Sequence, residues 1–251
     1  MERQLAPDIQ VIWPTWSPDR SQIAFLAPDP ADDSGDLDLY LVGLDNSAPR
    51  LIGSGISGHA APAWSPDGTR IAYTSFAGYD SMVESGSISI RVVEAATGVE
   101  EDLTGNEFEL AFNPSWSPDG QRLAFVAKDM SNDDRPQHAP GEVYVYAFAD
   151  RQLANLTEGR VDDVWNTTWS PRGDALLLYS RFGQTWYEPP STSIRSLDLA
   201  SNELTVIADL DQQPGMPAWA PDGLRFAYTA AESHITIVNV NGEAVQSEAT
   251  S

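Results

Sequence analysis

Clustered aspartates are the first residues of this chain whose spacing could do chemistry. Asp29, Asp32, Asp33, Asp36 and Asp38 crowd one short segment, and oxygen ligands gathered in this way can hold a calcium ion. Their order lacks the D-x-D-x-D-G spacing with a distal glutamate that a calcium loop uses. The pattern therefore favours a solvated acidic loop over a metal site.

Histidines and further carboxylates offer two other chemistries. His59, His138 and His234 are far apart in the sequence, and scattered surface histidines are favoured over a metal centre. Two carboxylates across a pocket could hydrolyse a glycosidic bond. The candidates for that role are Glu107, Glu109, Asp162 and Asp163.

No catalytic motif supports either chemistry. The sequence contains no G-x-S-x-G elbow, no H-E-x-x-H, no phosphate-binding glycine loop and no cysteine. We therefore predict no metal and no cofactor, and we favour a protein without catalysis.

Charge and composition narrow the partners. The 251 residues include 14 basic and 37 acidic side chains, for a net charge of −23, which should repel nucleic acid and anionic lipid. No apolar run approaches the roughly 20 residues of a membrane span, and residues 2–10 lack a signal-peptide core. We expect no nucleic-acid partner, no membrane insertion, and an extracellular or envelope protein rather than one adapted to high salt.

A repeated phrase shows which elements must position any site. PTWSPDRSQIAFLA at 14–27 recurs as PAWSPDGTRIAYTS, PSWSPDGQRLAFVA, TTWSPRGDALLLYS and PAWAPDGLRFAYTA, about 50 residues apart. Ser-Pro-Asp-Gly is suited to a tight turn, and the residues after it alternate large and small, as in a strand buried on both faces. The tryptophans of the five copies are Trp16, Trp64, Trp116, Trp169 and Trp219.

Each repeat holds four predicted strands. The tryptophan segment and the strand after the turn are followed by a second alternating run and then by a weaker one. The second runs are 37–44, 87–93, 143–148, 193–199 and 235–240, and the weaker runs are 50–53, 101–105, 155–159 and 204–208. Four-stranded units repeated around an axis form a β-propeller.

The W-S-P-D-G phrase, the (I/L)-A-(F/Y) strand and the later L-T segment resemble the WD40-like repeat of the TolB family. Similar repeats occur in propellers of tricorn-type and prolyl-oligopeptidase-type proteases, which carry catalysis in a separate domain. The resemblance covers essentially the whole chain. It implies an all-β propeller of four-stranded antiparallel blades. The five repeats predict a five-bladed propeller spanning 1–251, with part of a six-bladed or larger propeller, or a domain of a larger protein, as the alternative.

Ring closure has two candidate strands. Residues 2–8, ERQLAPD, resemble RQLANLT at 151–157 and could complete the last blade. Residues 243–249, EAVQSEA, compete for the same position. The first of these is favoured because a leading outer strand would join the first and last blades.

Specificity should reside where the repeats differ. The short corners form one face, whereas the long loops and the linkers before each tryptophan strand form the other, and variable loops on a rigid scaffold usually carry function. Exposed aromatics there suit a protein or peptide partner. The predicted contact residues are Trp13, His59, Tyr79, Phe108, His138, Trp165, Trp186 and Tyr187.

Alternatives to partner binding stay open at this point. Trp186 and Tyr187 could have only a structural role, in which they pack their loop against the sheet. The carboxylates and histidines at the channel mouth could serve a carbohydrate-active hydrolase or lyase. The chain could also be an excised or engineered repeat protein with no selected ligand. The TolB resemblance favours a non-catalytic scaffold that binds a protein or peptide, in the periplasm or outside the cell.

Overall fold

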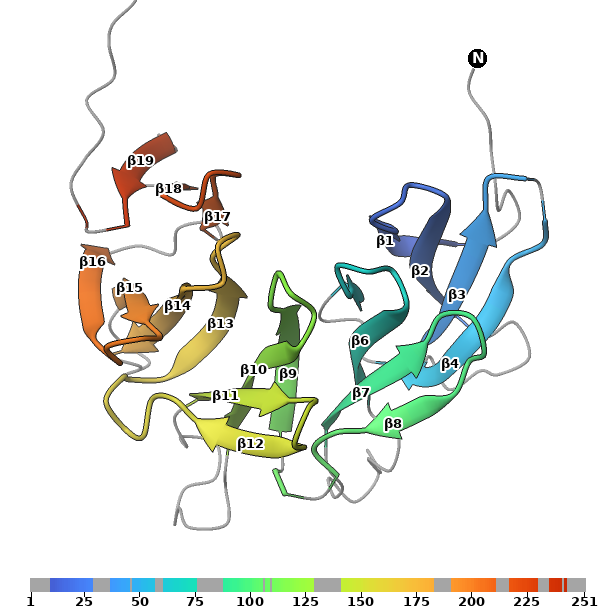
Figure 1. Cartoon of the computed structure of the whole chain (residues 1–251), viewed down its shortest axis with the longest axis horizontal. Helices are drawn as coiled ribbons and strands as arrows, with labels where there is room; N and C mark the ends of the chain where they lie inside the picture. The colour runs from blue at the N-terminus through green and yellow to red at the C-terminus, as the bar shows by residue number, and fades with distance from the viewer. Residues whose placement is uncertain are drawn as a thin grey trace, which may run out of the picture. The chain divides into compact units, whose positions relative to one another are not determined.

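The computed structural model contains antiparallel strands and no helix among the residues that it describes (Figure 1). None of these residues forms a helix of the length and hydropathy needed to cross a bilayer. The described residues are 10–28, 37–45, 47–56, 61–75, 88–105, 107–108, 110–128, 141–182, 191–210, 217–229, 235–240 and 242.

Each copy of the repeated phrase builds one sheet. Sheet 1 contains β1 (Ile12–Trp16), β2 (Gln22–Pro28), β3 (Leu37–Gly43) and β4 (Arg50–Ile56). Sheet 2 contains β5 (Ala63–Trp64), β6 (Arg70–Ser75), β7 (Ser89–Glu94) and β8 (Glu100–Asp102). A single bridge between Ile56 and Ser75 joins the two sheets.

The later repeats follow the same plan. Sheet 3 contains β9 (Leu110–Trp116), β10 (Arg122–Lys128), β11 (Glu142–Ala147) and β12 (Gln152–Asn155). Sheet 4 contains β13 (Val164–Trp169), β14 (Ala175–Phe182), β15 (Ser191–Asp198) and β16 (Leu204–Leu210). Sheet 5 has three described strands, β17 (Ala218–Trp219), β18 (Arg225–Thr229) and β19 (Ile235–Asn239).

The chain divides into two compact units. Unit 1 comprises residues 1–116 with 127–139, and unit 2 comprises residues 117–126 with 140–251. Sheets 1 and 2 belong to unit 1, sheets 4 and 5 to unit 2, and the boundary falls within sheet 3. The all-β, four-stranded antiparallel plan is confirmed. The number of blades and a single domain over 1–251 stay predictions, and both candidate closing segments, 2–8 and 243–249, lie outside the described residues.

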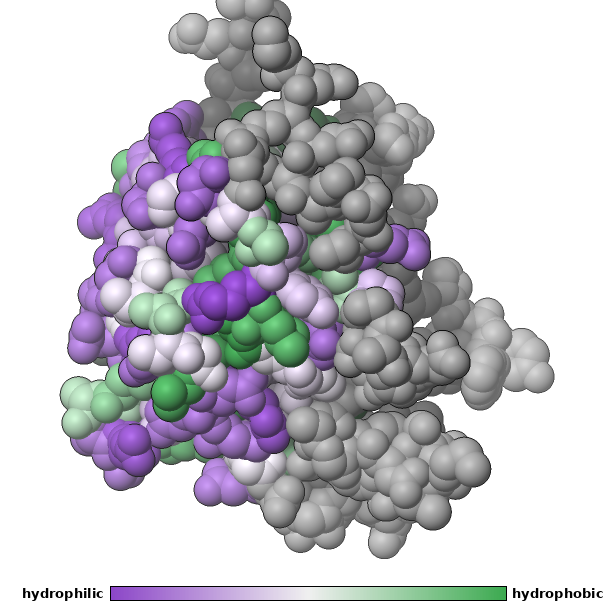
Figure 2. Space-filling view, turned by 90° about the vertical axis from the view of Figure 1, so that its right-hand side faces the viewer, coloured by the Kyte–Doolittle hydropathy of each residue, from purple (hydrophilic) through white to green (hydrophobic). Residues whose placement is uncertain are grey.

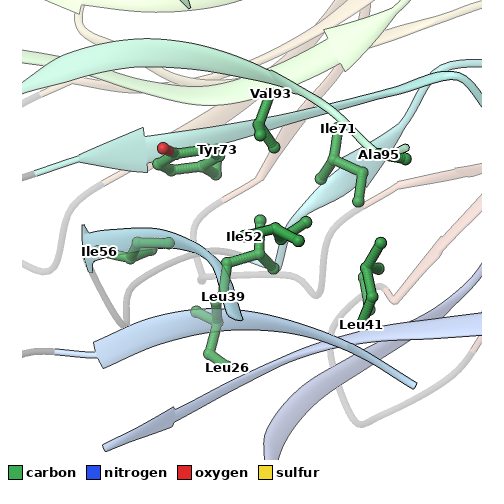
Figure 3. Packing of buried hydrophobic residues seen from close by; sticks show 10 residues of the cluster. Leu26, Leu39, Leu41, Ile52, Ile56, Ile71, Tyr73, Val93 and Ala95 are labelled. Carbon is green, nitrogen blue, oxygen red and sulfur yellow. The ribbon is translucent and has the colours of Figure 1, made fainter. Parts of the chain in front are cut away.

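The core of unit 1 lies between sheets 1 and 2. Leu26 and Leu39 point from sheet 1 toward Ile71 and Tyr73 of sheet 2, with Ile52 between them (Figure 3). All five side chains are buried. Both faces of β2 are covered. The alternation of large and small side chains predicted this for a strand that lies between two layers.

The core of unit 2 includes an equivalent layer between sheets 4 and 5. Leu177, Tyr179 and Ile194 of sheet 4 cluster with Phe226 and Tyr228 of sheet 5. Trp165 and Trp219 pack against this cluster and are only partly buried. This layer positions the loop end of β13 and β14, where Trp165 lies.

Every W-S-P-D-G corner is closed by the same two backbone hydrogen bonds. In the second repeat, Ser65 N donates to Arg70 O at 2.8 Å and Gly68 N donates to Ser65 O at 2.9 Å. Gly68 has φ +72°, a left-handed conformation that glycine adopts at little cost. Arg20 occupies the same position of the first corner at φ 61° with the hydrogen bonds kept, so the departure strains one corner without changing its register.

The corner aspartate is held by the buried serine before it. Ser65 Oγ donates to Asp67 Oδ1 at 2.6 Å, and Thr69 N donates to the same oxygen at 3.0 Å. These hydrogen bonds lower the pKa of Asp67, and the one from the serine hydroxyl has the largest effect. Where Arg172 replaces the aspartate, Ser170 Oγ donates instead to Asp174 at 2.7 Å, so the serine finds a carboxylate two residues later.

The repeat tryptophans tie one sheet to the next. An indole Nε1 donates to the carbonyl of the residue that precedes the tryptophan of the previous repeat. The pairs are Trp64 with Thr15 at 3.3 Å, Trp116 with Ala63 at 3.0 Å and Trp219 with Thr168 at 3.5 Å. Their role is architectural, as the repetition indicates.

Arginines cover two of these rings. Arg70 stands over Trp116 at 4.6 Å from the ring centroid, and Arg122 stands over Trp169 at 4.5 Å. Such cation–π contacts contribute about 0.5–2 kcal/mol each. Trp116 is 8% exposed, whereas Trp16 of the first repeat is 56% exposed. The same phrase therefore has a very different environment in different repeats.

Candidate ligand-binding surface

Three of the eight predicted contact residues fall within the described part of the chain. They are Trp13, Phe108 and Trp165. The other five, His59, Tyr79, His138, Trp186 and Tyr187, lie outside it, as do Glu109 and most of the aspartate-rich segment. Asp38, the described member of that segment, is buried on β3.

Trp13 and Phe108 have opposite surroundings in unit 1. Trp13 is 46% exposed, has φ 49° and lies where the β1–β2 register shifts. Phe108 is 7% exposed, so its ring is mostly covered by protein. Of these two predicted contact residues, Trp13 is therefore the more exposed one.

Trp165 is held in place at the loop end of sheet 4. It is the extra residue of a bulge, because Val164 pairs with Ser180 while Asn166 pairs with Tyr179. Its Nε1 donates to Asp163 Oδ2 at 2.6 Å. The ring is partly buried, so one part packs on the core layer of unit 2 and another part faces outward.

Asp163 anchors that tryptophan to sheet 3. Its Oδ1 accepts from Gly141 N at 2.8 Å, and its carbonyl accepts from Arg181 N at 2.8 Å. Gly141 allows this approach because a Cβ there would lie 2.0 Å from Val164 O. The carboxylate thus accepts one hydrogen bond from the indole and one from the Gly141 backbone, so it connects Trp165 to the start of β11.

Arg181 completes the cluster and was missed by the sequence analysis. Its guanidinium lies 4.5 Å from the centroid of the Trp165 ring. Its Nε is buried without a hydrogen-bond partner, as is Oγ1 of Thr192, its cross-strand partner on β15. A buried donor left unpaired costs about 1–3 kcal/mol, which calls for an explanation. The sequence gives only a weak signal, since Arg181 stands twelve residues after its repeat tryptophan, where Pro28, Phe76 and Ala231 stand in three repeats but Lys128 stands in the third.

Two of the candidate acid and base residues have other partners in the described part. Asp163 is engaged as above, and Asp162 lies 3.9 Å from Arg195. No group of three or more His, Cys, Asp or Glu among the described residues could hold a metal ion. We name the cluster of Asp163, Trp165, Arg181 and Thr192 the Trp165 site.

Comparisons of sequence find partial relatives. No family model matches the chain. It is 26% identical over 199 residues to the uncharacterized peptidase YuxL of Bacillus subtilis, covering 67% of this chain and 29% of that protein. It is 31% identical over 98 residues to the Tol-Pal system protein TolB of Francisella tularensis, covering 39% of this chain and 19% of that protein. The chain spans less than a third of the length of these relatives.

Solved structures match nearly the whole chain. TolB from Acinetobacter baumannii has a TM-score of 0.62 at 20% identity, over 93% of this chain and 53% of that one. The tricorn protease has a TM-score of 0.67 at 13% identity, over 92% of this chain and 25% of that one. An oligogalacturonate lyase in complex with manganese has a TM-score of 0.64 at 13% identity, over 94% of this chain and 64% of that one. The fold is that of the TolB-type β-propeller family.

A TolB-type fold accounts for the repeated corners but leaves the activity open, because the same fold occurs in peptidases and a lyase. The function of this chain must therefore be inferred from its own sites. Unit 1 offers a second one for comparison with the Trp165 site.

A cleft of about 600 Å³ lies in unit 1 of this TolB-type propeller, lined by β4, β7 and β8. Its charged residues are Arg50, Arg91 and Glu100. Figure 2 shows the molecule from the side on which β3, β4 and β8 lie in Figure 1. The coloured residues on this side are mostly hydrophilic and surround a smaller hydrophobic area. A cleft that carries both charge signs and is not mainly apolar is a weak candidate for a small-molecule site.

The charged groups of the cleft mostly bind one another. Arg91 lies 3.4 Å from Glu100 and 3.7 Å from Asp102. Tyr73 Oη donates to Glu100 Oε1 at 2.5 Å. Burial is the main cause that raises the pKa of Tyr73, and this hydrogen bond is the second. Gly53 makes room, because a Cβ there would lie 2.8 Å from Glu100 Oε1. This network joins three strands of sheet 2, and the charges of Arg91, Glu100 and Asp102 are paired within it, although Arg91 Nε is buried without a hydrogen-bond partner.

Proposed function

We propose that this chain is a non-catalytic, TolB-type propeller scaffold that binds a protein or peptide through its loop side, with the Trp165 site as a central contact. The number of blades that we propose for the ring is five. The observation that carries the proposal is the partly exposed Trp165 ring, which is held by Asp163 and contacts an arginine whose side chain has no acceptor among the described residues.

A fixed aromatic is a good anchor for a partner. Tryptophan and arginine are enriched among the residues that dominate binding energy. Holding the ring by the Asp163 hydrogen bond reduces the entropy lost on binding. The likeness to TolB proteins supports a protein partner in general, and it supports an envelope or extracellular location only by analogy.

The proposal is tested by selecting displayed peptides on the immobilised full chain. The selected peptides are then measured against wild type, Trp165→Ala and Leu224→Ser. Leu224 is the matched control, because it is 49% exposed and lies in the corner of sheet 5. Thermal unfolding checks that each variant is folded.

We expect Trp165→Ala to weaken peptide binding about tenfold or more, the usual loss for a central aromatic. Leu224→Ser should leave the affinity within about twofold, as for a residue outside the contact. A selection that yields no peptide above background, or peptides that depend on Leu224 and not on Trp165, would overturn the proposal.

A further inference from the structure

Apart from Arg20, whose side chain is exposed, the other arginines of the described residues differ from Arg181 in what they face. Arg91, Arg195 and Arg225 each lie within 4.0 Å of a carboxylate, at 3.4, 3.9 and 2.7 Å. Arg50 donates to the carbonyl of Ala95. Arg181 makes its cation–π contact with Trp165 and has neither an ion pair nor a side-chain hydrogen bond to the described part of the chain.

This is unexpected in a chain with 37 acidic and 14 basic residues. Nearby carboxylates are already engaged, since Asp163 directs one oxygen at Gly141 N and the other at Trp165 Nε1. Asp162 lies beside Arg195. The positive charge of Arg181 is therefore left for a group that comes from outside these residues.

The backbone and the ring together fix how Arg181 presents its donors. Its N–H donates to Asp163 O at 2.8 Å, and its strand position is set opposite Thr192. A guanidinium stacked on an indole keeps its edge free, and that edge carries donors in a planar fork. Because Nε is buried, the terminal nitrogens are the ones that a ligand can reach.

A carboxylate fits this arrangement better than a phosphate. The planar fork matches the two oxygens of a carboxylate. A phosphate dianion would be repelled more strongly by Asp162, Asp163 and the net charge of −23. The ligand class is therefore a monovalent carboxylate.

We propose that Arg181 binds a carboxylate of the peptide partner, either an acidic side chain or the C-terminus, while Trp165 packs against the adjoining residues. This inference rests on the proposed function. It names the chemical group that the Trp165 site recognises.

The experiment uses three synthetic random dodecapeptide libraries and the immobilised full chain. The first library has a free C-terminus, the second an amidated C-terminus, and the third is amidated and lacks Asp and Glu. Retention is measured for wild type, Arg181→Gln and Arg181→Lys. Oligogalacturonate is a fourth probe, because it carries carboxylates on a sugar.

We expect wild type to retain carboxylate-bearing peptides about 10- to 100-fold better than the third library, as hydrogen bonds to a charged group predict. Arg181→Gln should abolish this preference and Arg181→Lys should restore part of it, because lysine keeps the charge but lacks the fork. The first two libraries separate a terminal carboxylate from an acidic side chain. In NMR spectra, the Arg181 Nε–H resonance should shift on adding retained peptides.

The outcomes separate this inference from the proposed function. Peptides retained equally from all three libraries, with Arg181→Gln unchanged, would overturn the carboxylate assignment and leave peptide binding standing. Retention of oligogalacturonate alone, or of no probe, would overturn both. An Arg181 resonance that stays fixed while acidic peptides bind would also overturn the assignment, even if the variants proved unstable.

Discussion

The two ends of the sheets follow different rules. At the corner end, the same pair of backbone hydrogen bonds closes all five turns, even where Arg20, Arg172 or Ala220 departs from the phrase. At the loop end of sheet 4, Asp163 and Trp165 stand where the first repeat has Gln10 and Ile12. Repetition marks what the fold requires, and a departure that makes new contacts marks a candidate for function.

The largest expected effect concerns two tryptophans of the same phrase. Trp116→Ala should destabilise the chain by about 3–5 kcal/mol, because it removes a buried ring, the hydrogen bond to Ala63 and the contact with Arg70. Trp16→Ala should cost less than about 1 kcal/mol, since that ring is mostly exposed. Denaturant unfolding measures both values. Equal costs would contradict the difference in burial and would mean that another sheet covers Trp16.

Two glycines extend the comparison from side chains to backbone. Gly141→Ala at the loop end should cost about 2–3 kcal/mol, because the new Cβ would meet Val164 O at 2.0 Å and force β13 away. Gly68→Ala at the corner end should cost about 1 kcal/mol, since its Cβ has room and only the positive φ is strained. Chemical denaturation gives both values. If β13 could move away from the new Cβ without strain, Gly68→Ala would cost more stability than Gly141→Ala.

The Gly141 variant also sharpens the site. Moving β13 should disturb the hydrogen bond from Gly141 N to Asp163 and thereby the orientation of Trp165. Peptide binding should fall with Gly141→Ala and be kept with Gly68→Ala. Unchanged binding in both variants would show that Trp165 does not depend on this support.

Acid should weaken the corner end of the sheets. The pKa of Asp19 is lowered to about 2, mainly by the Ser17 hydroxyl, and the pKa values of Asp67 and Asp119 are lowered by Ser65 and Ser117. A carboxylate with a lowered pKa in the folded state stabilises the chain above its unfolded value of 3.8, and this stability is lost as the pH falls through the folded value. We therefore expect the denaturation midpoint to decrease between pH 4 and pH 2.

Substituting the corner aspartates tests that assignment. Asp67→Asn and Asp119→Asn should lower stability at pH 7 and flatten its decrease toward pH 2, because the titrating group is gone. Asp162→Asn is a matched control, as Asp162 lies at the loop end and has no such serine. An acid transition that is as steep in the double corner variant as in wild type would place the titrating groups elsewhere.

The sequence predicted the fold well because the repeat carries its own cross-checks. Five copies of a turn and an alternating strand fix the strand order, and the observed strands lie within a few residues of the expected ones. The weaker outer strands were placed less well, since β12 ends at Asn155 where the run 155–159 was expected. There Thr157 is buried and its hydroxyl accepts from Val143 N, so the L-T segment supports the neighbouring strand instead of forming one.

The site was predicted only in part. Trp165 was named as a candidate because aromatics in linkers are conspicuous. Asp163 was named for acid–base chemistry, whereas the structure shows that it accepts a hydrogen bond from the indole. Arg181 was missed because its significance is an absence of partners, which depends on how β14 and β15 pair. A sequence pattern shows which residues share a face, but it does not show which charges stay unpaired.

The smallest expected effect returns to the one corner without glycine. Arg20→Gly should stabilise the chain by about 0.5–1 kcal/mol, because Arg20 has φ 61° and glycine removes that strain. Part of the gain is offset by the greater freedom of glycine in the unfolded chain. The matched control is Ser21→Gly, next to it in the same corner, which should destabilise. If Arg20→Gly were also destabilising, the arginine side chain would contribute more to the first repeat than its exposed position indicates.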